Sequence, residues 1–203
     1  MAQSRFFAYL ERLRWIKRWG LKRNVIEENV MEHSWQVATI AHALAIIRNR
    51  LFSGNIDPNK VATAALYHDS SEVITGDLPS PIKYHSDAIK TAYKAIETEA
   101  EQELFSLLPE ALKEDFSELL LHAKIPAEIA RVIKAADIIS AYIKCQSEIN
   151  AGNQEFKQAS EEIEKRIRKL NMPEVDYFMS TFVESYLLTL DELLEQHDRA
   201  LNV

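Results

Sequence analysis

Residues 61–79 read VATAALYHDSSEVITGDLP. Apolar residues recur in this stretch at helical spacing and predict a helix over 59–74, which ends before the Gly-Asp-Leu-Pro segment. His68, Asp69 and Glu72 lie together near the C-terminal end of that helix and interrupt its apolar face. Because a helix C-terminus carries partial negative charge, carboxylates there favour a bound cation. The alternative is a polar helix end that is exposed to solvent.

Two further polar residues interrupt apolar stripes elsewhere in the chain. His33 lies four residues before Val37, on the stripe of a helix predicted over 29–50. Asp137 lies on the apolar stripe of a helix predicted over 127–151. Taken alone, His33 is a satisfied core histidine and Asp137 a buried partner of a Lys or Arg. Together with His68 and Asp69 they form a set of two imidazoles and two carboxylates, which suits a divalent first-row cation with open positions.

The composition favours an all-α fold. The chain has 203 residues with only 4 Gly and 6 Pro, well below the average share, and strand-like alternation is absent. Asn29 and Glu32 resemble a capping box, and Asp57-Pro58 is a typical helix start. We therefore expect one domain over 1–203, with a core of about 3–190 and roughly eight helices. The remaining helices are predicted over 4–15, 86–108, 109–122, 154–170 and 173–197.

Charge and hydropathy exclude several functions. The formal net charge of −7 disfavours binding to a nucleic-acid polymer, which needs a basic face. A small phosphorylated substrate stays compatible, because a bound cation reverses the local sign. No apolar run reaches the roughly 20 residues that cross a bilayer, and the N-terminus lacks the apolar core of a signal peptide, so we expect a cytoplasmic protein. The single Cys145 cannot form an internal disulfide and reads as a small buried hydrophobe.

The combination of His33, the His68-Asp69 pair and Asp137 resembles the HD-domain superfamily of metal-dependent phosphohydrolases. The adjoining segments closely resemble the bacterial 5′-deoxynucleotidases over about residues 3–190. Those segments are Arg18-Trp19, Glu32-His33-Ser34, Tyr67-His68-Asp69-Ser70-Ser71-Glu72 and Gly76-Asp77-Leu78-Pro79. One departure is Gly20, where a Pro commonly follows the Arg-Trp pair.

This resemblance implies hydrolysis of a deoxyribonucleoside 5′-monophosphate to the deoxyribonucleoside and phosphate. It implies one divalent ion per subunit, Co²⁺ or Mn²⁺, held by His33, His68, Asp69 and Asp137. Such an ion would polarise the phosphate and activate a water molecule, so that Asp69 and Asp137 also meet the substrate. The resemblance further implies a homodimer.

The resemblance also assigns roles around the ion. Arg18 would bind the phosphoryl oxygens, and Glu72 would act as general acid or proton shuttle. Trp19 would exclude a 2′-hydroxyl, and Asp77 would accept a hydrogen bond from the 3′-hydroxyl. The sugar pocket would be completed by Leu78, Pro79 and Ser80. Without the resemblance, Arg18 would be interpreted as a solvated surface charge and Glu72 as a surface residue. Trp19 would be an ordinary core residue and Asp77 a turn residue.

Two other functions stay open at this point. An enzyme with the same metal site could act on a triphosphate, a cyclic nucleotide or a ribonucleotide, which would need further basic groups near the metal. Lys83 is the only Lys or Arg close to the Gly76-Asp77 turn, which favours a monophosphate. A non-catalytic nucleotide sensor would have lost a ligand, Arg18 or Glu72, and all of these are present.

Overall fold

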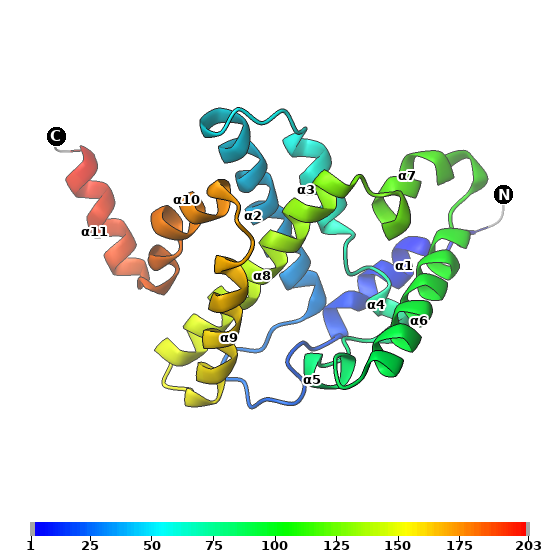
Figure 1. The fold of residues 1–203 in the computed structure, drawn as a ribbon, viewed down its shortest axis with the longest axis horizontal. Helices are drawn as coiled ribbons and strands as arrows, with labels where there is room; N and C mark the ends of the chain where they lie inside the picture. The colour runs from blue at the N-terminus through cyan, green and yellow to red at the C-terminus, as the bar shows by residue number, and fades with distance from the viewer. Residues whose placement is uncertain (1–2, 202–203) are drawn as a thin grey trace.

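The computed structural model describes residues 3–201, with side chains as far as Glu195, and contains eleven α-helices and no strand within that range (Figure 1). The predicted all-α class is confirmed. None of the described helices is long and apolar enough to cross a membrane. The α-helices are α1 (Phe6–Leu10), α2 (Val30–Leu51), α3 (Pro58–Leu66), α4 (Glu72–Thr75), α5 (Ser80–Lys83), α6 (Asp87–Ser106), α7 (Lys113–Leu120), α8 (Ala127–Asn150), α9 (Lys157–Arg168), α10 (Pro173–Phe182) and α11 (Leu190–Leu201). Short 3₁₀ helices span Glu11–Trp15, Glu110–Leu112, His122–Lys124, Gln154–Phe156 and Glu184–Leu187.

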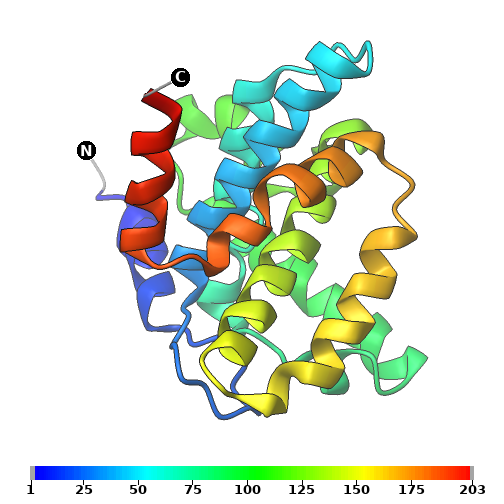
Figure 2. The ribbon, with the colours of Figure 1, turned by 90° about the vertical axis from the view of Figure 1, so that its left-hand side faces the viewer.

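Helices α2 and α8 cross at the centre of the bundle, and α3, α9 and α10 pack around them (Figures 1 and 2). Their facing sides are mostly apolar, with Leu44 of α2 and Ile139 of α8 completely buried. Cys145 lies in the same core, and burial raises the pKa of its thiol to about 12. The prediction of a buried, unreactive Cys145 is confirmed, because a thiol with that pKa stays protonated.

Capping side chains place the helix starts where the sequence predicts them. Asn29 accepts a hydrogen bond from the Glu32 backbone N–H at 3.0 Å and opens α2. Asp57 accepts from the N–H groups of Asn59 and Lys60 and opens α3, with Pro58 in the first turn. These caps fix the start of the helix that carries His33 and the start of α3, which leads into the turn that carries His68.

The predicted continuous helix over 59–74 is wrong. Helix α3 ends at Leu66, and α4 begins only at Glu72. Between them the backbone N–H groups bond three residues back, as from Ser70 to Tyr67 at 3.0 Å and from Glu72 to Asp69 at 3.0 Å. A three-residue period brings residues i and i+3 onto one side, so the turn aligns Asp69 with Glu72.

The predicted helix over 173–197 is also interrupted. Helix α10 ends at Phe182, a 3₁₀ turn follows, and α11 starts at Leu190. Thr189 and Glu192 form a reciprocal capping box, since the Thr189 N–H donates to the Glu192 carboxylate at 2.7 Å and the Glu192 N–H donates to Thr189 Oγ1 at 3.4 Å. This second start lets α11 leave the bundle at a new angle (Figure 2). A further short helix, α5, was not predicted and begins within the Pro-Ser-Pro segment.

Candidate active site

His33 and His68 each direct their Nε2 atom toward the same buried space. His68 Nδ1 donates to the Ala65 carbonyl at 2.7 Å, and His33 Nδ1 lies 3.1 Å from Ser140 Oγ. Ser140 gives its own proton to Gln36 Oε1 at 2.6 Å, so its oxygen accepts from His33 Nδ1–H. Both Nε2 atoms are therefore unprotonated in the neutral rings, and both are buried without a hydrogen-bond partner among the described residues.

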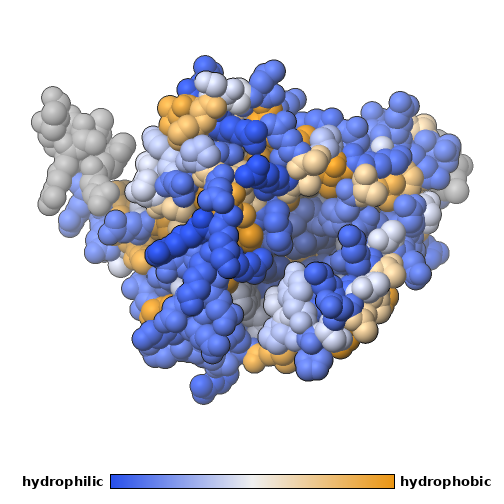
Figure 3. Space-filling model, viewed as in Figure 1, coloured by the Kyte–Doolittle hydropathy of each residue, from blue (hydrophilic) through white to orange (hydrophobic). Residues whose placement is uncertain are grey.

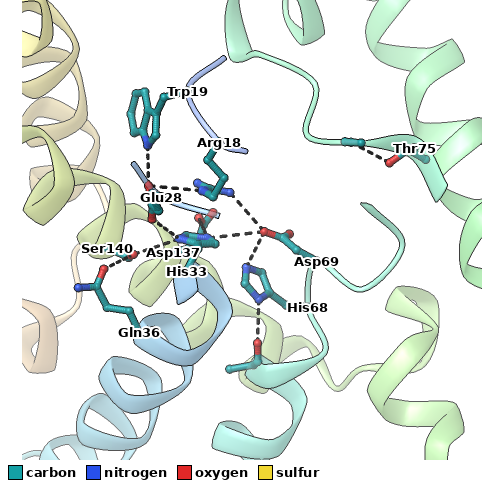
Figure 4. Close-up of polar contacts among 12 residues, drawn as sticks. Arg18, Trp19, Glu28, His33, Gln36, His68, Asp69, Thr75, Asp137 and Ser140 are labelled. Atoms are coloured by element: carbon teal, nitrogen blue, oxygen red, sulfur yellow. Dashed lines mark hydrogen bonds and ion pairs between the residues drawn. The ribbon is translucent and has the colours of Figure 1, made fainter. Parts of the chain in front are cut away.

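Two carboxylates face these nitrogens (Figure 4). Asp69 Oδ2 lies 3.1 Å from His68 Nε2 and 3.5 Å from His33 Nε2. Asp137 Oδ1, contributed by α8, lies 3.3 Å from His33 Nε2. Ligand atoms of His33, His68 and Asp69 all lie within 4.8 Å of one another, which is the spacing that lets one ion bind all three. The two orphaned nitrogens beside carboxylate oxygens fit a divalent cation with mixed imidazole and carboxylate ligands.

The electrostatics of the cluster favour an added cation. Although burial opposes it, the imidazoles of His68 and His33 hold the pKa of the Asp69 carboxyl well below its usual range. Burial also acts to raise the pKa of Asp137, but the hydrogen bond with His33 and the charge of Lys134 hold it well below its usual range. Both groups are therefore ionised at neutral pH, and a divalent ion would balance their charge.

Arg18 reaches the cluster from the loop before α2. Its Nη1 lies 3.5 Å from Asp69 Oδ2, its Nε lies 3.7 Å from Glu28 Oε2, and the side chain is only 12% exposed. The loop is tied to α8, because buried Glu148 accepts hydrogen bonds from the Val25 and Ile26 backbone N–H groups at 2.9 and 3.0 Å. Arg18 is thus a fixed, buried cation beside the Asp69 carboxylate rather than a solvated surface charge.

A cavity of about 480 Å³ opens above this cluster. Figure 3 shows the molecular face hollowed near its middle, with hydrophilic residues around the hollow. The predicted substrate residues and Glu72 all line it, namely Arg18, Trp19, Asp69, Glu72, Asp77, Leu78, Pro79, Ser80 and Asp137. The metal candidates His33 and His68 lie behind Asp69, as buried residues.

Glu72 lies in the cavity wall as a protonated acid. Burial first, and then the charges of Asp69 and Asp77, raise the pKa of its carboxyl to about 10. Its Oε2 is buried without a hydrogen-bond partner among the described residues. Burial and Asp69 also raise the pKa of Asp77. A neutral carboxylic acid next to a cation-binding cluster can donate a proton at neutral pH.

The raised pKa of Glu72 predicts a pH dependence of stability for the metal-free protein. Above a pH of about 4.5 the folded protein keeps a proton that the unfolded chain loses, so the free energy of unfolding falls as the pH rises toward 10. Glu72→Gln cannot ionise and will lose this dependence, which amounts to at most about 1.4 kcal/mol per pH unit. Urea unfolding of chelated protein at pH 5, 7 and 8.5 measures the effect.

Glu72→Gln should be more stable than the unaltered chain at pH 8.5, with a difference that shrinks toward pH 5. Glu99→Gln, on the exposed side of α6, is the matched control and should follow the unaltered chain at every pH. Parallel pH profiles for Glu72→Gln and the unaltered chain would contradict a proton held on Glu72.

Some lining residues were missed by the sequence interpretation. Besides Lys83, the basic residues Lys22, Lys134 and Arg166 also line the cavity, from segments far from the Gly76-Asp77 turn. On α9, Gln158, Glu162 and Arg166 recur every four residues opposite a buried apolar stripe, which is a signal that could have been read. Glu28 lies in an irregular loop, where no periodicity marks it.

An all-α bundle with two unpartnered imidazole nitrogens beside two ionised carboxylates is the arrangement that the resemblance to HD-domain metal-dependent phosphohydrolases implies. The structure is similar to an HD-domain phosphohydrolase from Listeria innocua, with a TM-score of 0.79 and 22% identity over 98% of this chain and 97% of the other. It is also similar to a protein from Magnetospirillum magnetotacticum MS-1 described as a predicted metal-dependent phosphohydrolase, with a TM-score of 0.61 and 25% identity over 90% and 89% of the two chains.

The sequence comparisons narrow the class. Residues 5–186 match the family described as YfbR-like 5′-deoxynucleotidase. The chain is 53% identical to a 5′-deoxynucleotidase of Yersinia pestis (strain Pestoides F), over 94% of this chain and 96% of that protein. It is 50% identical to the 5′-deoxynucleotidase PBPRA2627 of Photobacterium profundum, over 95% of this chain and 100% of that protein. The chain belongs to the YfbR-like 5′-deoxynucleotidase family, which confirms the resemblance drawn from its motifs.

Proposed function

We propose that this 5′-deoxynucleotidase hydrolyses deoxyribonucleoside 5′-monophosphates at one divalent ion held by His33, His68, Asp69 and Asp137. The observation that carries the proposal is the pair of buried, unpartnered Nε2 atoms facing Asp69 at the floor of an Arg-lined cavity. Held by these residues, a divalent cation would polarise a phosphate oxygen and would lower the pKa of a water molecule that serves as the nucleophile. Co²⁺ and Mn²⁺ suit mixed imidazole and carboxylate ligands.

Arg18 binds and orients the phosphoryl group. Its guanidinium lies beside Asp69, so a phosphate placed over the floor of the cavity meets it directly. The planar guanidinium can donate hydrogen bonds to two phosphate oxygens at once. It also balances the negative charge that spreads over these oxygens during phosphoryl transfer. Burial of the side chain keeps the guanidinium in one orientation before the substrate arrives.

Glu72 donates the proton that the leaving group needs. When the phosphorus–oxygen bond breaks, the deoxyribose 5′-oxygen carries negative charge and takes a proton from the neutral Glu72 carboxyl. Water attacks the phosphorus from the opposite side, and the proton that it loses reprotonates the Glu72 carboxylate through solvent, so that the products are the deoxyribonucleoside and phosphate. Burial is the chief cause of the raised pKa of Glu72 in the metal-free protein, and it favours the protonated acid before the reaction.

The sugar is selected by the cavity wall. The Trp19 ring lines the cavity and packs on Phe156 at a centroid distance of 5.2 Å, so it presents a fixed bulky surface. A 2′-hydroxyl against that ring would lose its hydration without gaining a partner. Asp77 accepts from the 3′-hydroxyl, and Leu78, Pro79 and Ser80 close the pocket around the sugar.

The chain acts as one domain over 1–203, as a homodimer, and in the cytoplasm. Support for association comes from α11, which projects from the bundle and exposes Leu190 by 71% and Leu194 by 57% (Figure 2). Tyr186, just before that helix, is 42% exposed. Apolar side chains grouped on one projecting segment are typical of an interface between copies. A single Cys fits a reducing compartment.

Phosphate release from dAMP and AMP, measured side by side on chelated protein with Co²⁺ or Mn²⁺ restored, tests the function. We expect metal-dependent release from dAMP and at least about tenfold slower release from AMP. Trp19→Ala should raise AMP hydrolysis relative to dAMP by about tenfold, because the 2′-hydroxyl then has room. Trp35→Ala, on an exposed face of α2, is the matched control and should keep the preference.

The same assay also uses dATP and cyclic AMP as substrates. The basic residues Lys22, Lys134 and Arg166 line the cavity and could bind additional phosphate groups. Faster turnover of either substrate than of dAMP would move the assignment to another nucleotide. Binding of dAMP without any turnover in the metal-loaded protein would instead identify a sensor.

A further inference from the structure

Glu28 connects three groups of the site through a single carboxylate (Figure 4). Its Oε2 accepts a hydrogen bond from the Trp19 indole N–H at 2.8 Å and lies 3.7 Å from Arg18 Nε. Its Oε1 lies 3.4 Å from His33 Nδ1. The side chain is 12% exposed, so solvent offers little competition for these contacts. No other carboxylate among the described residues contacts both the Arg18 guanidinium and the indole N–H of Trp19.

The backbone fixes Glu28 opposite the residues it contacts. The Arg18 N–H donates to the Glu28 carbonyl at 3.0 Å, and the Val30 N–H donates to the Ile16 carbonyl at 3.0 Å. These bonds flank an antiparallel bridge between Lys17 and Asn29. The two short segments therefore hold one register, which places the Glu28 backbone beside the segment that carries Arg18 and Trp19.

Trp19 occupies a backbone conformation that needs such support. Its φ of 59° lies in the left-handed region, which is uncommon for a bulky residue. Residues in strained conformations persist only where their surroundings over-determine them. Phe156 supports the face of the ring, and Glu28 holds its N–H edge, so the ring has one orientation in the cavity wall.

The same carboxylate orients the Arg18 guanidinium. Arg18 Nε is buried without a hydrogen-bond partner among the described residues, and it faces Glu28. The opposite side of the guanidinium faces Asp69 and the cavity. The charge of Glu28 therefore attracts the Nε side of the guanidinium. The Nη side, which faces Asp69 and the cavity, is turned toward the substrate.

We infer that Glu28 is a positioning residue that sets the preference for deoxyribose, because it fixes the Trp19 ring against the 2′ position and Arg18 against the phosphate. This inference rests on the proposed function, in which Trp19 meets the sugar and Arg18 the phosphate. Glu28 itself touches neither the substrate nor the ion. Its loss loosens the Trp19 geometry that separates dAMP from AMP, and it also loosens Arg18, which lowers kcat for both substrates.

The test compares kcat and KM for dAMP and AMP in cobalt-loaded, full-length protein. The variants are Glu28→Gln, Glu28→Ala, Trp19→Phe and the double variant Glu28→Gln/Trp19→Phe. Trp19→Phe keeps an aromatic ring but removes the indole N–H and makes the side chain smaller. Glu27→Gln is the matched control, since Glu27 is 73% exposed and pairs only with Lys17 among the described residues. Cobalt content and thermal unfolding are measured on every protein.

We expect Glu28→Gln to lower the dAMP-to-AMP ratio of kcat/KM by about tenfold, the range of a lost charge-assisted hydrogen bond, with unchanged cobalt content. Trp19→Phe should lower the dAMP-to-AMP ratio by a similar factor. The double variant should lower the ratio no further than either single variant, because each disrupts the hydrogen bond between Trp19 and Glu28. Glu27→Gln should match the unaltered chain.

A folded, cobalt-loaded Glu28→Gln that keeps the ratio within about twofold of the unaltered chain overturns the inference, as does an equal fall for both substrates. If both Glu28 variants fail to fold, Trp19→Phe decides, and an unchanged ratio there overturns it. An unaltered chain that shows no cobalt-dependent preference for dAMP refutes the proposed function itself, which separates the two failures.

Discussion

Asp69→Asn is expected to remove both the bound cation and hydrolysis. Asp69 Oδ2 is the oxygen that faces both unpartnered imidazole nitrogens, at 3.1 and 3.5 Å. The carboxyl has a pKa well below its usual range, because His68 and His33 outweigh the effect of burial, so it presents full negative charge at neutral pH. Asparagine keeps the shape and loses that charge.

A divalent ion contributes several kcal/mol to the transition state, so kcat/KM for dAMP should fall by at least about 10³-fold in Asp69→Asn. Metal content after dialysis should fall in parallel. Asp176→Asn, on the exposed side of α10, is the matched control and should keep both. Asp69→Asn protein that retains its ion and hydrolyses dAMP within tenfold of the unaltered chain would place the ion elsewhere.

Arg18→Ala is expected to lower kcat for dAMP by about 10³-fold, the lower end of what a transition-state arginine supplies. The guanidinium is buried beside Asp69 and already oriented by Glu28, so little of its effect is lost to reorganisation. Arg18→Lys should recover only a small part of the activity, because an ammonium cannot form two parallel hydrogen bonds to phosphate.

Lys17→Ala is the control for Arg18→Ala, because Lys17 is the adjacent cation and is 65% exposed. Its kcat should stay within about twofold, as expected for an exposed ion pair of small energy. Circular dichroism must show that Arg18→Ala is folded. A folded Arg18→Ala with kcat within tenfold of the unaltered chain would remove Arg18 from the phosphate site.

The sequence alone determined the all-α class, the family and the starts of α2, which carries His33, and of α3, which precedes the turn with His68. Local interactions decide these features: Asn29 and Asp57 cap helices through neighbouring backbone N–H groups, and apolar periodicity marks the buried faces. The same periodicity predicted that His33, His68 and Asp69 face inward, and their ligand atoms do lie within 4.8 Å of one another. The roles of these residues as metal ligands stay a prediction.

Only the tertiary structure decided how the site is built. A helical pattern could not show that the chain tightens after Leu66 into three-residue turns, because such turns depend on what packs around them. The pKa of Glu72 depends on burial and on Asp69 and Asp77, which are set by folding rather than by composition. Glu28 and Trp19 lie in irregular segments before α2, where no periodicity marks them. Only folding brings the Glu28 carboxylate to Trp19 and to His33 on α2. Side chains that meet through loops are brought together by the packing of the whole chain, which no local pattern records.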